Sequence, residues 1–462
     1  MTRTSKIIAA GFLVRAFAAQ ALFWISYLRL PVARSLQLGG GFWFFAEDGP
    51  YYLLSASKAA SHGLLGIATI GPFEPSRFFL QVIALLILAL GAVASLAILI
   101  NCAAYAITCA MLVRMKANEV VIAAIAFSPA ALLFSLQLLK DTLFFLLIVL
   151  MVAAFRRWQE LWRGDDASLR NVLVCGAAIF AIVFALAGIR WYFAVIVWGT
   201  SAILFLFAAW SAPRRMWALA AGAMLFILLA QSVRLGALDT PPQVARLLNP
   251  VTALQWKPEI ATQLVAEKRY GFDTTPAATT IVAGPLLGPP VLETPDVTTA
   301  AHEVVVTPHA TPVNPATAQA KPTPAGTKPT PTVVSAKPSP GPVSTTGPAR
   351  LIAGFAATFL PRLLAQSLGL IHVGGGRGLW IFAEVDTIVF DLVLIYAIVS
   401  CARALRRKTA RLTPLFLFLA IVFISTAGPM IYTVNNFGTI FRLRQMLYVM
   451  AAVLPVTLRK NE

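Results

Sequence analysis

A chain of 462 residues with 58% hydrophobic and only 12% charged residues is too apolar for a soluble globular protein, in which about a quarter of residues are charged. Its formal net charge of +18 would fit nucleic-acid binding, but most basic residues stand at the ends of apolar segments. In a membrane protein this pattern is an orientation signal, so we predict no nucleic-acid partner.

The first apolar segment, residues 7–28, is too long for the apolar region of a signal peptide, and no small-x-small cleavage site follows it. We predict an uncleaved first span, followed by a large loop over residues 29–77. Inside this loop, residues 48–62 predict a short helix on the membrane surface, with Asp48 as its cap and Pro50 in the first turn.

Residues 78–113 are too long for one straight span and too short for two, which predicts one long bent or tilted helix. Residues 351–371 are apolar but interrupted by Pro361-Arg362, which predicts an interfacial helix that does not cross. The fold class is therefore all-α, a polytopic transmembrane helical bundle with juxtamembrane helices. About ten spans are expected, at residues 7–28, 78–113, 119–136, 142–155, 171–189, 193–210, 216–233, 380–400, 414–432 and 446–458.

Composition divides the chain into three parts. Residues 1–234 form an N-terminal transmembrane bundle, and residues 351–462 form the interfacial helix and the C-terminal spans. Between them, residues 235–350 are rich in Pro, Thr and Ala, with few aromatic residues. Such a segment buries little apolar surface, which predicts an extended, largely disordered linker.

The basic clusters set the expected orientation. They lie near residues 114–116, 156–170, 214–215 and 403–411, and all of them fall on one side if the predicted spans alternate. That side is then the cytoplasm, with both termini, and the Pro/Thr-rich linker is extracytoplasmic. The high Ala and Pro content is typical of a high-GC bacterium, so the expected location is the bacterial cytoplasmic (inner) membrane.

This topology leaves a set of charged residues on the outer face, where short-loop basic residues are disfavoured. A charge near membrane depth costs roughly 2.5–3.5 kcal/mol on insertion scales, so such residues usually face a water-filled cavity or a ligand. Cations converging from several loops predict a site for a lipid phosphate or pyrophosphate. The cations are Lys140, Arg190, Arg377, Arg442 and Arg444, and the acids beside them are Glu47, Asp48, Glu74 and Asp141.

Simpler interpretations exist for several of these residues. Asp48 also fits a helix cap before Gly-Pro, and Lys140 with Asp141 fits an ordinary loop pair. Arg190, followed by Trp191 and Tyr192, fits an aromatic belt at the membrane interface. Within the spans, an ion pair between Arg15 and Asp391 is conceivable. The four cysteines and four histidines show no metal-ligand spacing, so no metal residue is assigned.

This layout resembles the GT-C superfamily of membrane glycosyltransferases, which use polyprenyl-phosphate sugars. The resemblance covers residues 1–234 and 351–462. In the first outer loop, the carboxylate pair Glu47-Asp48 is followed by an aromatic-rich surface helix. Lys140-Asp141 opens the second outer loop, and a late outer loop carries basic residues. Residues 435–444 also look like a motif of bacterial surface-polysaccharide membrane proteins.

The resemblance implies transfer of a sugar from a polyprenyl-phosphate donor to a cell-envelope glycan, lipid or protein acceptor. Asp48 would be the general base or orient the acceptor, with Glu47 and Asp141 in the same site, and the basic residues would bind the lipid phosphate. Several members bind a divalent metal through two acids in the second outer loop. Here a single acid follows Lys140, so a divalent metal is possible but no cofactor is assigned.

Two other classes stay open. An undecaprenyl-pyrophosphate glycan polymerase or ligase would need the outer arginines more than Asp48. A lipid-linked-glycan transporter or flippase would use intramembrane charges such as Arg15, Glu384 and Asp391, and would show internal repeats, which we do not find.

Overall fold

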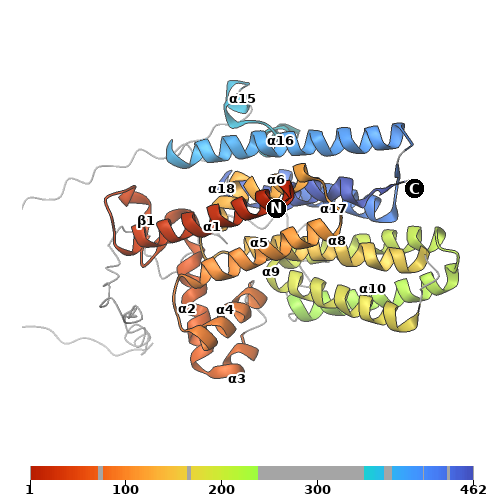
Figure 1. The fold of residues 1–462 in the computed structure, drawn as a ribbon, viewed down its shortest axis with the longest axis horizontal. Coiled ribbons are helices and arrows are strands. Elements are labelled where there is room, and N and C mark those ends of the chain that lie inside the picture. Colours follow the sequence, from red (N-terminus) through yellow and green to blue (C-terminus); the bar gives the residue numbers. More distant parts are fainter. Residues whose placement is uncertain are drawn as a thin grey trace, which may run out of the picture.

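The structure is a computed structural model of the 462-residue chain. It describes residues 2–70, 76–163, 168–237, 348–368, 377–408, 410–433 and 437–460. The predicted linker, and with it the predicted disorder of residues 235–350, lies almost entirely outside the described residues. The described part is mostly helical, as the sequence predicts (Figure 1).

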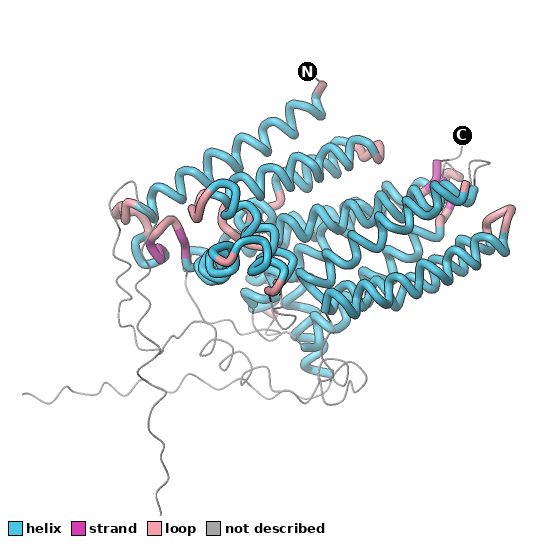
Figure 2. Tube along the Cα trace, turned by 90° about the horizontal axis from the view of Figure 1, so that it is seen from below, coloured by secondary structure: helices cyan, strands magenta, loops and turns pink. Residues whose placement is uncertain are grey.

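Within the part of the chain that the structure describes, six helices are long and apolar enough to cross a membrane, which indicates a multi-pass membrane protein. Figure 2 shows long helices of the bundle lying alongside one another. The six are α1 (Arg3–Tyr27), α5 (Leu96–Arg114), α9 (Leu169–Trp210), α10 (Arg215–Ala237), α16 (Arg377–Arg406) and α17 (Pro414–Thr433).

Three of the other predicted spans differ from the helices that form. Residues 119–136 give two short helices, α6 (Glu119–Phe127) and α7 (Pro129–Phe134), because Pro129 cannot continue the backbone hydrogen bonds of α6. Residues 142–155 belong to the longer α8 (Asp141–Arg163). The last helix, α18 (Phe437–Val453), begins well before the predicted residue 446, so the predicted connection over residues 435–444 is helical from Phe437 on.

The prediction of one bent helix over residues 78–113 is wrong. Two helices form, α4 (Arg77–Leu90) and α5, and they are separated at Gly91, which has a φ of 90°. Glycine adopts this left-handed conformation without the steric cost that other residues incur. With 14 residues, α4 is about 21 Å long, too short to cross a bilayer core of about 30 Å. It packs against the first loop instead.

Helix α9 reverses direction at Arg190, whose backbone is non-helical (φ −146°, ψ 83°). In its first half, the Cys175 thiol lies against the Ala154 carbonyl of α8, and Arg190 pairs with Asp141, so the two segments are antiparallel. In its second half, ring contacts pair Phe193 with Phe144 and Phe205 with Phe155, so this segment runs parallel to α8. The predicted division of residues 171–210 at Arg190 is confirmed.

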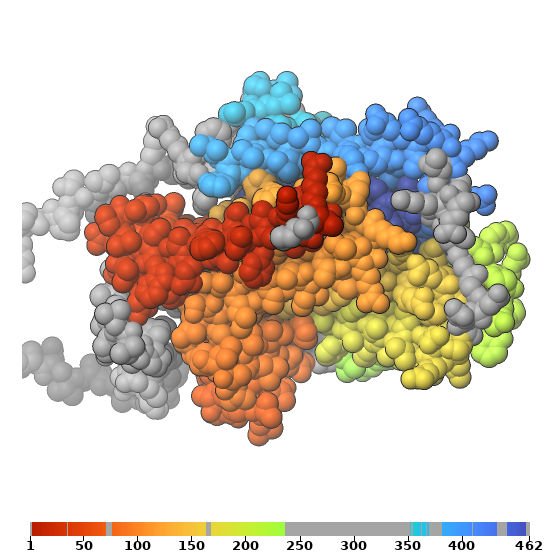
Figure 3. Space-filling model, in the orientation of Figure 1, coloured from red at the N-terminus to blue at the C-terminus, as the bar shows by residue number. Residues whose placement is uncertain are grey.

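The first loop is folded and lies against the end of α1. A two-stranded hairpin pairs β1 (Gln37–Gly39) with β2 (Phe42–Trp43), and the Trp43 indole donates to the Leu22 carbonyl at 2.8 Å. The predicted helix at residues 48–62 is confirmed as α2 (Asp48–Ser61), which is followed by α3 (Gly63–Ala68), and its position on the membrane surface stays a prediction. Figure 3 shows α2, α3 and α4, in orange and red, projecting from the side of the long bundle.

Contacts between distant segments gather the basic clusters at one end of the bundle, which we call the basic end. Arg156 of α8 donates to the Met115 carbonyl after α5, and the Leu415 amide of α17 donates to Gln159 of α8. Strand β3 (Ala410–Arg411) pairs with β4 (Arg459–Lys460), which follows the short helix η4 (Leu454–Thr457). The charge pattern used to predict the orientation therefore corresponds to a real grouping in space.

The predicted interfacial helix at residues 351–371 forms as two short helices, α14 (Pro348–Phe359) and α15 (Arg362–Ser367), broken at Pro361. Helix α14 lies so close to α17 that a Cβ at Gly354 would clash with the Ile431 carbonyl oxygen. Neither helix is long enough to cross a membrane.

Candidate functional site

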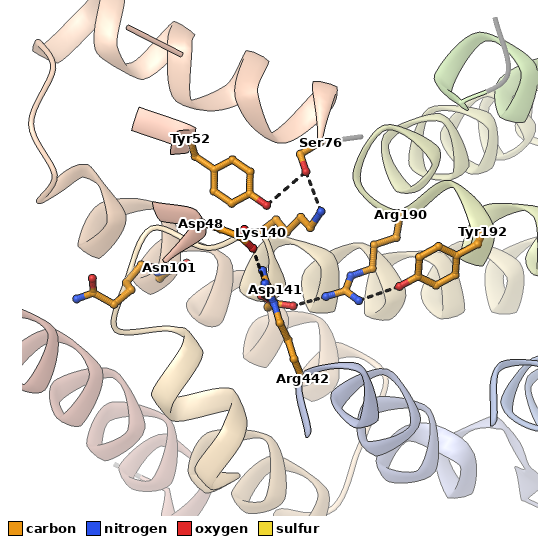
Figure 4. A network of polar contacts seen from close by, with 10 residues as sticks. Asp48, Tyr52, Ser76, Asn101, Lys140, Asp141, Arg190, Tyr192 and Arg442 are labelled. Atoms are coloured by element: carbon orange, nitrogen blue, oxygen red, sulfur yellow. Dashed lines mark hydrogen bonds and ion pairs between the residues drawn. The ribbon is translucent and has the colours of Figure 1, made fainter. Parts of the chain in front are cut away.

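A cluster of charged side chains occupies the end of the bundle opposite the basic end (Figure 4). Helix α8 has 23 residues, so its first residue, Asp141, lies about 33 Å from the basic end. The side chains come from α2, from the start of α8 and the loop before it, from the reversal of α9, and from α18. The structure thus brings together Asp48, Lys140, Asp141, Arg190 and Arg442, which the sequence places in four separate segments.

Arg442 lies between two carboxylates from different helices. Its Nη1 donates to Asp48 Oδ2 at 2.6 Å, and its Nε donates to Asp141 Oδ2 at 2.9 Å. A guanidinium group has a planar fork of donors that suits such bridging. Asp48 is the first residue of α2, so this contact ties the first loop to α18 at the other end of the sequence.

The second oxygen of Asp141 accepts from Arg190, and both side chains are buried. Arg190 also donates to the Tyr192 hydroxyl at 2.9 Å and lies over the Phe144 ring at 5.0 Å from the ring centre. The Arg190 side chain is therefore a buried member of the cluster, and the aromatic belt at the membrane interface stays a prediction. Because a buried charge that loses its partner costs several kcal/mol of stability, each member of this pair depends on the other.

Lys140 lies beside the two arginines and donates to the Ser76 hydroxyl at 2.7 Å, and that hydroxyl lies 3.5 Å from the Tyr52 hydroxyl. Burial lowers the pKa of Lys140 to about 7, and the nearby Arg190 and Arg442 add to this shift against the opposing Asp141 and Asp48. Burial raises the pKa of Tyr52 to about 12, so this phenol stays protonated at neutral pH. Lys140 is thus the group in the site whose charge changes near neutral pH.

Glu47 precedes Asp48 and stands at the N-cap position of α2, where its side chain makes no capping hydrogen bond, and Asp48, which the sequence allowed as the cap, is the first residue of the helix. The side chain is exposed at the edge of the site. Partial desolvation and then the charge of Asp48 raise the pKa of Glu47, against a lowering effect of Arg442.

The side chain of Asn101, in α5, holds the loop that carries Lys140. The Asn101 side-chain amide donates to the Ser135 carbonyl at 2.8 Å and to the Gln137 carbonyl at 2.7 Å. Gly49 of α2 also packs against this loop. A Cβ at Gly49 would lie 3.6 Å from the Leu138 carbonyl oxygen. The loop is therefore positioned by side chains and backbone from two other helices.

Arg444 does not join the cluster. It is buried in the bundle, where it pairs with Asp386 of α16 at 2.8 Å and donates to the Thr387 hydroxyl at 2.6 Å. The other oxygen of Asp386 accepts from the Ala130 amide at the start of α7. Arg444 thus holds α16, α18 and α7 together, and the prediction that it lies beside Arg442 in the phosphate site is wrong.

Two further predictions have separate outcomes. Arg377 is the first residue of α16, and its side chain lies outside the described part of the structure. The suggested pair of Arg15 with Asp391 does not form. Arg15 instead donates to the backbone carbonyls of Ala126 at 2.6 Å and Gly11 at 3.1 Å, and stacks on Tyr105.

Sequence reasoning missed four residues around the cluster: Tyr52, Ser76, Asn101 and Tyr192. Tyr192 was assigned only to an interfacial belt, and Tyr52 was not singled out within the aromatic-rich surface helix. Asn101 carried a usable signal, because an amide inside an otherwise apolar helix needs a hydrogen-bond partner. Ser76 carried no signal that separates it from other loop serines.

The donor set around the cluster suits an anion. Among the described residues, no group of three or more His, Cys, Asp or Glu side chains is placed to hold a metal ion. Arg442 stands between the two carboxylates that a bridging cation would use. Two buried donors in the cluster, Arg190 Nε and Arg442 Nη2, have no hydrogen-bond partner in the described structure. Buried donors without acceptors are costly, so an acceptor from a ligand would stabilise them.

Comparison with known proteins found no matching family model, no matching curated protein and no matching solved structure. The resemblance to the GT-C superfamily therefore stays a prediction.

Proposed function

We propose that this protein is an integral membrane glycosyltransferase that moves a sugar from a polyprenyl-phosphate donor to a cell-envelope acceptor. The observation that carries the proposal is the bridge of Arg442 between Asp48 and Asp141 at the end of the bundle opposite the basic end. In the proposed reaction Arg442 binds the donor phosphate and Asp48 binds the acceptor, and a hydrogen bond of 2.6 Å joins the two side chains.

The proposed orientation follows from the basic end. Positive residues near span ends favour the cytoplasm, so the charged cluster faces the extracytoplasmic side and both termini face the cytoplasm. A lipid-linked substrate then approaches from the outer leaflet, with its chain among the apolar helices and its head group at the cluster.

In the proposed reaction, an acceptor hydroxyl attacks the anomeric carbon of the donor sugar. The new C–O bond forms as the bond to the phosphate oxygen breaks, and the lipid phosphate leaves with the electron pair. Arg442 stabilises the charge that develops on this oxygen, a type of contribution worth about 10²–10³ in rate. Arg190 and Lys140 surround the same charge.

The acceptor is held by the carboxylates of the first loop. Asp48 keeps one oxygen on Arg442 and orients the acceptor hydroxyl. The pKa of Glu47 is raised, so its carboxylate is a better proton acceptor than an ordinary glutamate at the edge of the site. Because Arg442 already bridges the carboxylates, the proposed reaction does not require a divalent metal.

The test measures sugar transfer by the purified protein in nanodiscs, with a panel of labelled polyprenyl-phosphate sugars. Asp48→Asn is expected to abolish transfer, and Glu47→Gln to reduce it. The matched control is Glu160→Gln, which makes the same acid-to-amide change at an exposed carboxylate near the basic end. Full turnover by well-folded Asp48→Asn protein would disprove the assignment.

The transporter alternative loses part of its support in this fold. Arg15 is occupied by backbone carbonyls, and Glu384 accepts from the Leu363 amide of α15 at 3.1 Å. Two of the three intramembrane charges named for a transporter thus have structural partners. No observation in the described residues favours the alternatives over the transferase.

A further inference from the structure

Lys140 differs from the other cations of the cluster in that no carboxylate of the described residues contacts it. Arg442 and Arg190 each pair with an acid, whereas within the described structure the Lys140 ammonium group has one hydrogen bond, to the Ser76 hydroxyl. An ammonium group has three donors, so Lys140 keeps donors available for a ligand.

The charges of the cluster balance without Lys140. Among the described side chains that form ion pairs here, two carboxylates, Asp48 and Asp141, face two guanidinium groups, Arg190 and Arg442, while Glu47 lies exposed at the edge of the site. A protonated Lys140 therefore leaves one uncompensated positive charge in a largely dehydrated site, and a neutral Lys140 leaves none. A bound phosphodiester brings one negative charge, and the balance then favours the protonated lysine.

We infer that Lys140 takes up a proton from solvent when an anionic phosphodiester head group binds beside it, so that binding and protonation are one coupled step. This inference rests on the proposed function for the identity of the head group. The proton goes onto Nζ, and no other bond forms or breaks. When the sugar has left, the lipid phosphate carries a second charge, which the same protonated lysine helps to stabilise.

The surroundings of Lys140 fit this role. In the free protein its pKa lies near 7, so a substantial share of the molecules carry neutral lysine at neutral pH, and a neighbouring anion raises that pKa. Proton uptake is then expected above about pH 7, and affinity is expected to fall up to about tenfold per pH unit in that range. Among the described residues, the charged or titratable groups around Lys140 are Asp48 and Tyr52 of α2, Asp141 of α8, Arg190 of α9 and Arg442 of α18.

The experiment measures binding of methyl farnesyl phosphate to the full-length protein in nanodiscs by titration calorimetry. This probe is a diester with one charge and no second ionisable proton. Titrations at about pH 8.5, repeated in buffers of different ionisation enthalpy, give the number of protons taken up per molecule of diester bound. Uptake approaching one proton is expected for the wild type, with much less at about pH 6.

Lys140→Arg keeps the positive charge and removes the titration. It is expected to bind the diester without proton uptake and with an affinity that no longer depends on pH in this range. Lys58→Arg, at an exposed lysine in the last turn of α2, makes the same change outside the cluster and is expected to behave as the wild type.

The outcomes separate the two proposals. Wild-type binding without uptake at about pH 8.5, or unchanged uptake in Lys140→Arg, overturns the role of Lys140 and leaves the transferase proposal standing. Binding with uptake, combined with no sugar transfer from any donor, overturns the transferase and supports Lys140 as the proton-binding group. A wild type that binds no diester at either pH contradicts both.

Discussion

Arg442 and Arg444 stand two positions apart on the same helix, yet they belong to different parts of the molecule. A separation of two residues turns the side chain about 200° around a helix, so the two guanidinium groups point in nearly opposite directions. Arg442 is 23% exposed and bridges carboxylates from α2 and α8, whereas Arg444 is 1% exposed and pairs with Asp386 inside the bundle. Burial and partners, not residue type, separate a binding group from a structural one.

The largest expected effect is that of Arg442→Ala on activity. Loss of a donor that stabilises the leaving phosphate is expected to lower turnover about 10²–10³-fold, as for an oxyanion-stabilising donor. Folding is expected to persist because Asp141 keeps its contact with Arg190. Sugar transfer and elution from a sizing column are measured together, with Arg157→Ala at an exposed position near the basic end as control. Near-normal turnover would remove Arg442 from the site.

Arg444→Met tests the structural side of the comparison. It leaves Asp386 buried without its charge partner, which is expected to cost about 3–5 kcal/mol of stability. All four cysteines are buried, so a thiol-reactive fluorogenic dye reports thermal unfolding. The double variant Arg444→Met/Asp386→Asn is expected to recover part of the loss. If the single variant melts like the wild type but no longer binds lipid phosphate, the two arginines have been assigned the wrong way round.

Asn101→Ala has a smaller expected effect, because it acts on the loop and not on the substrate. Without the two hydrogen bonds to Ser135 and Gln137, the loop carrying Lys140 is held less tightly. A displacement of this kind is expected to lower kcat by about tenfold, within the range for misplaced catalytic groups, with KM changed little. Steady-state kinetics with one donor checks this. A raised KM at unchanged kcat would instead place Asn101 in substrate binding.

The smallest expected effect is that of a chelator. Arg442 occupies the position between Asp48 and Asp141, so transfer is expected to be unchanged when the protein is treated with EDTA and assayed in metal-free buffer. Loss of transfer that Mg²⁺ or Mn²⁺ restores would show that Arg442 yields its place between the carboxylates to a metal in the working enzyme.

Much of the fold was predictable because apolar length and charge placement are local properties. The reversal at Arg190 and the surface helix after Asp48 follow directly from the residues there. The division of residues 78–113 was missed, although Gly91 marks it, because one glycine in an apolar run does not by itself break a helix. The start of α18 was missed because its two arginines looked like a loop.

The sequence by itself determined that the chain is a helical membrane protein, where its basic residues gather, and which outer charges are unusual. Hydrophobic length and charge distribution decide these properties, and both can be read along the chain. Only the tertiary structure decided the partners: Arg442 with Asp48 and Asp141, Arg444 with Asp386, and Lys140 with Ser76. These pairs join residues as far apart as 48 and 442, and helix packing sets their distances. No local pattern encodes which buried charge will meet which.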